Sequence, residues 1–348
     1  EATKTLKAYQ AAPDTKENLA TIPLLKKEDL SYDVVPLLTN ESTVSGIKVL
    51  HHDYSTNGIG YLRLLFDVKN IPAKYVKYLG LFKTLLGSLD TQDHTYQTLE
   101  QDIDINTGGI GYAITTNKKD DDYGVNLSIR ANTLYDKLGF TFDIIKEVLK
   151  TTNFKMNTRI KECLAIESSK MQQALVGAGH AKSYVRALSY IEPVFYYNDQ
   201  VEGVGYFETI TELLKDYENS FEELSNTLKE MAEYIFTKEN LLVSFTGQVE
   251  GLNEVNKLLP EFVKDLYDAK PLADPFVFTP NQQNEGFKAP YDVNYVALVG
   301  NYKKDNLPYT GALQVFQNAI STDYLWTNVR VLGGAYGCMC GFTGTGIS

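Results

Sequence analysis

One pattern occurs twice along this chain and limits the folds open to it: a strand-like segment, a helix, a double glycine and a further strand. The first copy has its glycines at Gly108 and Gly109, and the second has them at Gly333 and Gly334. Glycine accepts the left-handed backbone that ends a helix and turns the chain sharply into a strand. A repeat over this distance predicts two domains of the same kind.

The first copy has the fuller pattern. Five segments are predicted as strands: 47–51, 59–68, 109–116, 123–130 and 240–246. The segment 109–116 is predicted because it follows the double glycine, and the other four because their apolar residues alternate or are of β-forming types. Seven segments have the apolar spacing of helices: 72–86, 96–105, 134–150, 159–176, 182–190, 206–235 and 252–266. Strand pairs separated by helices predict an α+β domain, with helices on one face of a mostly antiparallel sheet.

Two local features refine this prediction. Ser220 and Glu223 match a capping box, so the segment 206–235 is expected to split near Asn219. In the strand 123–130, Val125, Leu127 and Ile129 alternate with polar residues. One face of that strand is therefore expected to be buried and the other to be wet.

Proline-rich stretches suggest the domain boundaries. Residues 1–30 are expected to hold the end of a helical linker and a connector, followed by a first domain over 31–266. Residues 267–290 have little periodicity and contain four prolines, which is typical of an interdomain linker: Pro271, Pro275, Pro280 and Pro290.

The second domain is expected to span 291–348. It would begin with a strand over 294–301, continue with a helix opened by Pro308, and enter a further strand from Gly334. No residues remain for the helices and strands that the first domain has beyond this point. We therefore expect the second domain to be incomplete and to expose apolar surface.

The chain is acidic, with 44 Asp and Glu against 33 Lys and Arg among its 348 residues. Phosphate binding requires a positive field, so a nucleic-acid partner is not expected. No apolar run approaches the roughly 20 residues of a membrane span, so no membrane partner is expected either. The acidic surplus favours basic ligands or serves only to keep the protein soluble. Three cysteines are too few for a disulfide framework and indicate a reducing compartment, taken here as the cytoplasm.

Five blocks of sequence resemble one family in order and in spacing: PDTKENLATIPLL, TNGIGYLRLLFDV, LLGSLDT, INTGGIG and YLWTNVRVLGGAYG. They are similar to the third and fourth domains of the presequence-protease branch of the insulinase-type zinc peptidases, the branch that contains falcilysin. The resemblance covers nearly the whole chain. It implies four homologous α+β domains in two halves, which close around a chamber in which unfolded peptides are cut. This chain would be the C-terminal half, with unfolded peptides and the N-terminal catalytic half as its partners.

The family binds zinc through the inverted motif H-x-x-E-H, in which two histidines one helical turn apart hold the metal and the glutamate activates a water. That motif does not occur in this sequence. The resemblance places Tyr78, Leu81 and Phe82 at the positions of the first ligand, the base and the second ligand, and none of the three can do that chemistry. We therefore expect zinc in the parent protein, bound outside this chain. No metal ligand and no catalytic residue are expected within it, and the chain alone should be inactive.

The remaining histidines and cysteines predict no other metal site. His51 and His52 are neighbours in a strand and so point to opposite faces. His94 lies in an acid-rich helix start that is typical of a capped, solvated turn, and His180 lies in a glycine-rich segment without a partner histidine. The cysteines lack a second pair to complete four ligands and are interpreted as packing residues: Cys163, Cys338 and Cys340.

Two residues are candidates for a functional site: Arg330 and, six residues later, Tyr336. Arg330 is expected to end a helix, and the glycines at 333 and 334 permit a tight reversal before Tyr336. A guanidinium and a phenol that converge can hold a substrate carbonyl and stabilise the charge that develops on it. In the resembled family such an Arg and Tyr reach across the closed chamber to the zinc site. The resemblance therefore implies a substrate and transition-state role for Arg330 and Tyr336.

Other interpretations stay open at this point. An arginine at a helix end also complements the helix dipole, and tyrosine is common in strands. The same fold family includes degenerate members, so a catalytically dead scaffold or peptide-binding subunit is the alternative function. An unrelated hydrolase is disfavoured, because no Gly-x-Ser-x-Gly elbow is present and Cys163 has no neighbouring base in the sequence.

Overall fold

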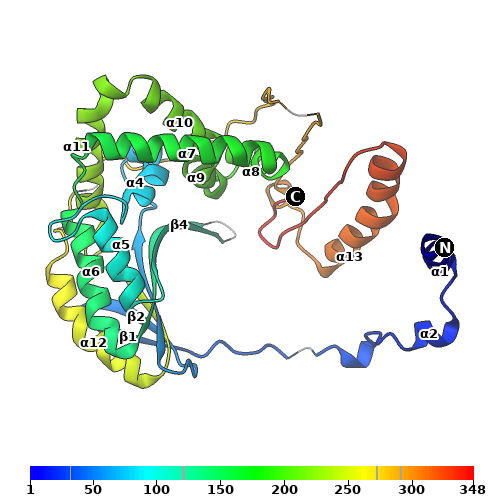
Figure 1. Cartoon of the computed structure of the whole chain (residues 1–348), viewed down its shortest axis with the longest axis horizontal. Coiled ribbons are helices and arrows are strands. Elements are labelled where there is room, and N and C mark those ends of the chain that lie inside the picture. Colours follow the sequence, from blue (N-terminus) through cyan, green and yellow to red (C-terminus); the bar gives the residue numbers. More distant parts are fainter. Residues whose placement is uncertain (32, 120–121, 272, 291) are drawn as a thin grey trace. The chain divides into compact units, whose positions relative to one another are not determined.

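The structure, a computed structural model, describes every residue except 32, 120, 121, 272 and 291. It forms two compact units, Glu1–Leu37 and Leu38–Ser348 (Figure 1). The first unit holds the helices α1 (Ala2–Ala11) and α2 (Lys16–Ala20) and the 3-10 helix η1 (Lys27–Asp29). All of its described residues are exposed, so these helices bury no apolar core of their own.

A six-stranded sheet forms the framework of the second unit, in the order β1-β2-β6-β3-β5-β4. Its strands are β1 (Thr39–Val44), β2 (Ile47–His52), β3 (Ile59–Asp67), β4 (Ile110–Lys118), β5 (Tyr123–Leu134) and β6 (Leu241–Thr246). All neighbouring strands are antiparallel except β2 and β6, which are parallel. The predicted α+β class with a mostly antiparallel sheet is confirmed. The sequence predicted five of these strands and missed β1.

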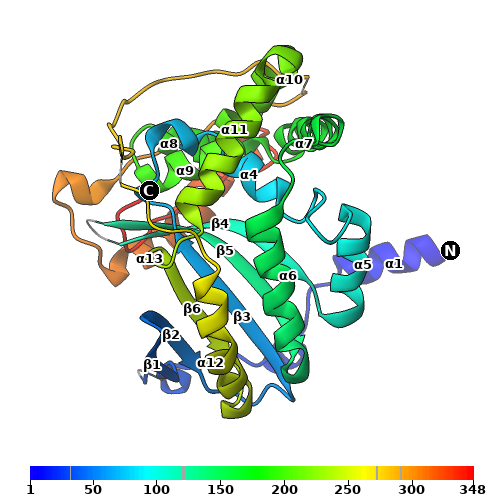
Figure 2. The same cartoon turned by 90° about the vertical axis from the view of Figure 1, so that its left-hand side faces the viewer.

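One face of the sheet is covered by helices, as Figure 2 shows for α6 and α12 lying across β6, β3 and β5. The alternation in the strands accounts for this, because Leu62, Leu64 and Phe66 of β3 are buried and the residues between them face the other way. We call the side of the sheet without helices its open face. The polar face of β5 is not wet throughout, since Ser128 is buried between its strand neighbours.

The helices that follow the strands are shorter or longer than predicted at several ends. They are α3 (Ala73–Val76), α4 (Leu79–Leu85), α5 (Tyr96–Asn106), the 3-10 turn η2 (Tyr135–Lys137), α6 (Leu138–Thr151), α7 (Asn157–Gly177), α8 (Gly179–Ser189), α9 (Pro193–Glu202), α10 (Val204–Lys215), α11 (Tyr217–Ile235) and α12 (Val249–Lys264). The sequence did not predict α9. Its first residue is Pro193, a residue favoured at the first helical position.

The predicted split near Asn219 is three residues too late. The break between α10 and α11 falls at Asp216. The Ser220 hydroxyl donates to the Asp216 carbonyl oxygen at 2.9 Å, so it bonds within the first turn of α11 and does not cap a new helix.

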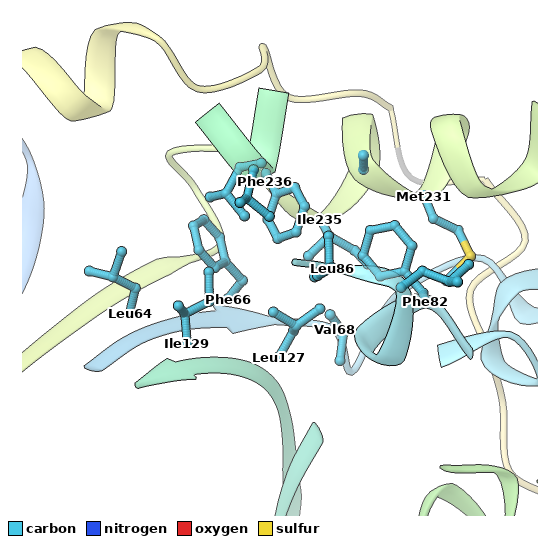
Figure 3. Packing of buried hydrophobic residues seen from close by; sticks show 14 of the residues in the cluster. Leu64, Phe66, Val68, Phe82, Leu86, Leu127, Ile129, Met231, Ile235 and Phe236 are labelled. Carbon is cyan, nitrogen blue, oxygen red and sulfur yellow. The ribbon is translucent and has the colours of Figure 1, made fainter. Parts of the chain in front are cut away.

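Aromatic side chains fill the space between the sheet and the helices (Figure 3). Phe66 from β3 meets Phe236 edge to face, with ring centroids 5.1 Å apart, and Phe82 from α4 lies 5.8 Å from the same ring. Ring pairs at these distances add to the burial of apolar area. The core of the second unit therefore joins the sheet to α4 and to the residue that follows α11.

The last part of the chain is irregular. After residue 291 it contains the 3-10 turn η3 (Tyr302–Asp305), the helix α13 (Gly311–Ala319) and the π-helical segment η4 (Ile320–Leu332). The helix predicted after Pro308 is present, but the strands predicted over 294–301 and from Gly334 are not found among the described residues. Among the described residues, the two stretches pair only around the isolated bridge between Asn301 and Ile347, next to which Gly300 and Ser348 exchange two backbone hydrogen bonds. This pairing is too short for the continuous ladder that a strand requires. The predicted domain boundaries stay predictions.

Every helix among the described residues is too short or too polar to span a lipid bilayer.

Candidate functional site

The helix that the resemblance aligns with a zinc-binding helix is α4, and it is part of the hydrophobic core. Leu81 and Phe82 have no exposed surface, and Tyr78, directly before the helix, packs against the same cluster. The side chains of Leu and Phe offer no lone pair to a metal, and zinc in proteins is held by Cys, His, Asp or Glu rather than by a phenol. This helix therefore does not fit a zinc site. Among the described residues, no three His, Cys, Asp or Glu side chains gather as a metal site requires.

The two adjacent histidines are held on opposite faces of β2, as predicted. His51 is buried, with its Nε2 2.8 Å from the Gly247 carbonyl oxygen. His52 is half-buried and lies within hydrogen-bond distance of Thr39 Oγ1 and Ser244 Oγ, at 2.9 and 3.2 Å. Each ring has at least one hydrogen-bond partner within the fold, which agrees with a structural role for both histidines.

His94 has partners that the sequence did not reveal. Its Nδ1 lies 2.9 Å from Glu147 Oε1 on α6, and its Nε2 lies 3.2 Å from Asp102 Oδ2 on α5. The hydrogen bond to Glu147 raises the pKa of His94, against the lowering effect of burial. The expected cap is present, since the Thr95 hydroxyl oxygen accepts from the Thr98 N–H at the start of α5, but the His94 side chain is mostly buried rather than solvated. No local pattern could have shown this, because Glu147 is 53 residues away.

The predicted site residue Arg330 lies in the last turn of η4. Gly334 adopts a positive φ of 74° and its N–H donates to the Arg330 carbonyl oxygen at 3.0 Å, which turns the chain back along the helix. The Arg330 guanidinium lies 4.1 Å from the centre of the Trp326 ring, one turn earlier, and its Nε donates to the Tyr336 carbonyl oxygen at 3.1 Å. The reversal predicted from the two glycines is present, and it holds the guanidinium in one place.

Tyr336 follows this reversal with its side chain 94% exposed. The structure brings Arg330 to the main chain of Tyr336, while the phenol extends into solvent. A guanidinium with free N–H groups and an exposed phenol are both hydrogen-bond donors available to a ligand. Their joint action on one carbonyl group stays a prediction.

A buried carboxylate, which sequence reasoning missed, connects this last part of the chain to the sheet. Glu192, at the start of α9, is 1% exposed and accepts hydrogen bonds from Lys118 Nζ and Asn301 Nδ2, each at 2.6 Å. Lys304 Nζ lies 2.9 Å from Glu192 Oε1, the oxygen that also accepts from Asn301. Burial acts to raise the pKa of Glu192, but the bonds from Lys118, Asn301 and Lys304 outweigh it, so that the pKa lies below its ordinary value.

A second ionic cluster holds the stretch before residue 291. Arg186 on α8 binds the buried Asp199 at 2.8 Å through Nη1 and binds Glu285 at 2.8 Å through Nε. Tyr190 donates its hydroxyl to the same Glu285 at 2.5 Å. The linker predicted over 267–290 is therefore tied to α8 rather than free. Neither cluster has a local sequence signal, because the partners lie far apart along the chain.

Comparison with protein families gives two matches in series. Residues 1–213 match the family described as associated with peptidase M16, subfamily C, and residues 284–347 match "PreP C-terminal domain".

Curated relatives match over almost the whole chain. A protein named HypA from Clostridium perfringens (strain 13 / Type A) is 30% identical over 342 residues, which are 97% of this chain and 35% of that protein. Presequence protease 1, chloroplastic/mitochondrial, from Arabidopsis thaliana is 28% identical over 345 residues, 98% of this chain and 32% of that protein. The chain thus spans about a third of the length of these relatives.

Among solved structures, a conserved protein from Enterococcus faecalis V583 has a similar fold. The TM-score is 0.55 at 14% sequence identity, and the likeness covers 89% of this chain and 74% of that one. At this identity the likeness concerns the fold alone.

Proposed function

This chain belongs to the family associated with peptidase M16, subfamily C, and from that premise we propose that it is the non-zinc-binding C-terminal half of a zinc-dependent endopeptidase that degrades unfolded peptides in a closed chamber. The observation that carries the proposal is the order of the two family matches, 1–213 and then 284–347, on a chain that aligns with about a third of a presequence protease. The packed apolar positions on α4 support it, because they cannot take part in metal chemistry.

The role proposed for this chain is to form one wall of the chamber and to supply hydrogen-bond donors. Arg330 would donate from its guanidinium to the oxygen of the scissile carbonyl, and Tyr336 would donate from its phenol to the same oxygen. These bonds strengthen as negative charge develops on that oxygen, so they lower the barrier more than they tighten substrate binding. When bound in the other half, zinc would supply a water activated for attack.

The stacking of Arg330 on Trp326 supports this role. Its bond from Nε to the Tyr336 carbonyl oxygen leaves both Nη groups free for a ligand among the described contacts. A donor that is already held in place costs no reorganisation during the reaction. The location of the protein in the cytoplasm belongs to the same proposal and rests on its free cysteines, Cys163, Cys338 and Cys340.

The test is peptide turnover by the full-length parent protein. Arg330→Ala should lower kcat by about 10²-fold or more with a smaller change in KM, which is the loss seen when one preorganised oxyanion donor is removed. Tyr336→Phe should act in the same direction. Tyr324→Phe is the matched control, because Tyr324 is an exposed tyrosine on the same segment and should leave turnover unchanged. Unaltered kcat in both site variants would contradict the assigned roles.

A further inference from the structure

Two arginines lie side by side on the open face of the sheet. Arg63 of β3 and Arg130 of β5 are direct partners in the antiparallel ladder, and both are exposed. Directly opposite residues project from the same face with their Cβ atoms about 5 Å apart, and like charges in that arrangement destabilise a sheet. Folding alone therefore gives no reason for this pair.

The surroundings leave both charges uncompensated. Across the sheet, Arg63 pairs with Ser244 on its other side and Arg130 pairs with Gly111, so short side chains flank the pair. The described residues give neither guanidinium an ion-pair partner, although the chain has 44 acidic residues. The arginine pair is thus a local positive site on an acidic protein.

The acidic groups of the same face are already engaged. Glu41 of β1 binds Lys48 of β2 at 2.6 Å. Asp67, at the end of β3, accepts a hydrogen bond from the Lys69 N–H at 2.8 Å. Glu41 lies three strands from β3 and Asp67 lies four residues from Arg63 along β3, which is roughly 13–14 Å in each case. A carboxylate from another molecule is therefore the complementary partner.

We propose that Arg63 and Arg130 form a carboxylate-binding pair on the open face of the sheet, which takes the acidic side chains of an unfolded peptide. The inference rests on the proposed function, because it treats this face as part of the wall that meets peptides. Guanidinium groups bind carboxylates through two parallel N–H bonds. In an extended peptide, side chains at positions i and i+2 lie on one side about 7 Å apart, which two arginines on adjacent strands can span.

The experiment measures binding of labelled peptides to this chain by fluorescence anisotropy. The probes are two unfolded 16-residue peptides of Gly, Ser and Thr with amidated C-termini, one carrying Glu-x-Glu and the other Gln-x-Gln at the same positions. We expect the acidic peptide to bind about tenfold more tightly at low salt, since exposed charged pairs each contribute up to about a fivefold effect. The preference should shrink as salt is added.

The double variant Arg63→Gln/Arg130→Gln should abolish the preference. It should fold normally, because it removes a repulsion, and its unfolding midpoint in denaturant shows whether it does. The control Lys215→Gln/Lys229→Gln removes the same charge from exposed positions on α10 and α11 and should keep the preference. A preference that survives in the double variant, or equal binding of both peptides to the unaltered chain, would overturn the proposal.

These outcomes are separable from the proposed function. Turnover of the parent protein without any acidic preference in this chain would remove the arginine pair and leave the peptidase role intact. If the acidic preference depends on Arg63 and Arg130 but the parent protein shows no turnover, the arginine pair stands and the proposed peptidase role fails.

Discussion

Large apolar side chains are mostly buried in the sheet region, residues 38–266, but mostly exposed in the C-terminal segment, residues 292–348. In the sheet region, residues such as Phe82 and Phe236 have no exposed surface. In the C-terminal segment, Val296 and Leu298 are 91% and 95% exposed. The fold is therefore stabilised by the sheet region, whereas the proposed donors Arg330 and Tyr336 belong to a segment with little core of its own.

The contact between the two regions, which we call the join, is formed by polar side chains around Glu192 rather than by apolar ones. Asn301 and Lys304 of the C-terminal segment bind the buried Glu192, which Lys118 of the sheet also binds. Few buried apolar contacts are typical of regions that open at low free-energy cost. The comparison thus predicts large effects on global stability from the sheet region and local effects from the join.

The largest effect is expected from the core of the sheet region. Phe82→Ala removes a side chain that packs on Phe154 and Phe236 at centroid distances of 5.8 Å. We expect the free energy of unfolding to fall by about 3–5 kcal/mol, measured by denaturant titration, because the neighbours cannot close the cavity.

The matched change in the C-terminal segment should have almost no effect. Leu298→Ala is expected to alter the free energy of unfolding by less than about 0.5 kcal/mol, because the side chain is already exposed. Equal losses of unfolding free energy from Phe82→Ala and Leu298→Ala would show that the two regions share one core, which would contradict the difference in burial between them.

A smaller effect than that of the core is expected at the join. Glu192→Gln leaves Lys118 and Lys304 without their countercharge, at a cost of about 2 kcal/mol, less than full removal of a buried partner because the amide oxygen still accepts one bond. Hydrogen exchange should accelerate in residues 292–348 and stay slow in the strands. Glu223→Gln, at an exposed position on α11, should change neither.

The same carboxylate sets the pH dependence of the join. The pKa of Glu192 is lower in the folded protein than in the unfolded chain, so its contribution to stability is present above the unfolded pKa. That contribution is lost as pH falls through the folded pKa. The protection factors of the amides in residues 292–348, which correct for the slower intrinsic exchange at low pH, should therefore fall on acidification, and Glu192→Gln should remove that dependence.

Most of the sheet region could be predicted because its apolar residues follow simple periods. The alternation in β3 and β5 and the stripe through Leu79 and Phe82 give the strands and the core helix directly. β1 could not be found this way, since the segment TNESTV is polar and has no buried residue. The parallel pairing of β2 with β6 joins residues about 190 apart, which no local pattern encodes.

The site was predictable only in part. The glycines after Arg330 gave the reversal, because the left-handed backbone at Gly334 has a local sequence signal. The strands expected on either side of it were wrong, because a strand forms only where a partner ladder exists. Glu192, Asp199 and Glu147 went unnoticed, since their roles depend on charges brought together by the fold.

The most direct test of the account is a zinc-binding measurement on this chain by itself, with peptide turnover recorded on the same samples and on the full-length parent protein. We predict no stoichiometric zinc and no turnover from this chain, and one zinc with turnover from the parent. One tightly held zinc ion together with peptide hydrolysis by this chain alone would contradict it.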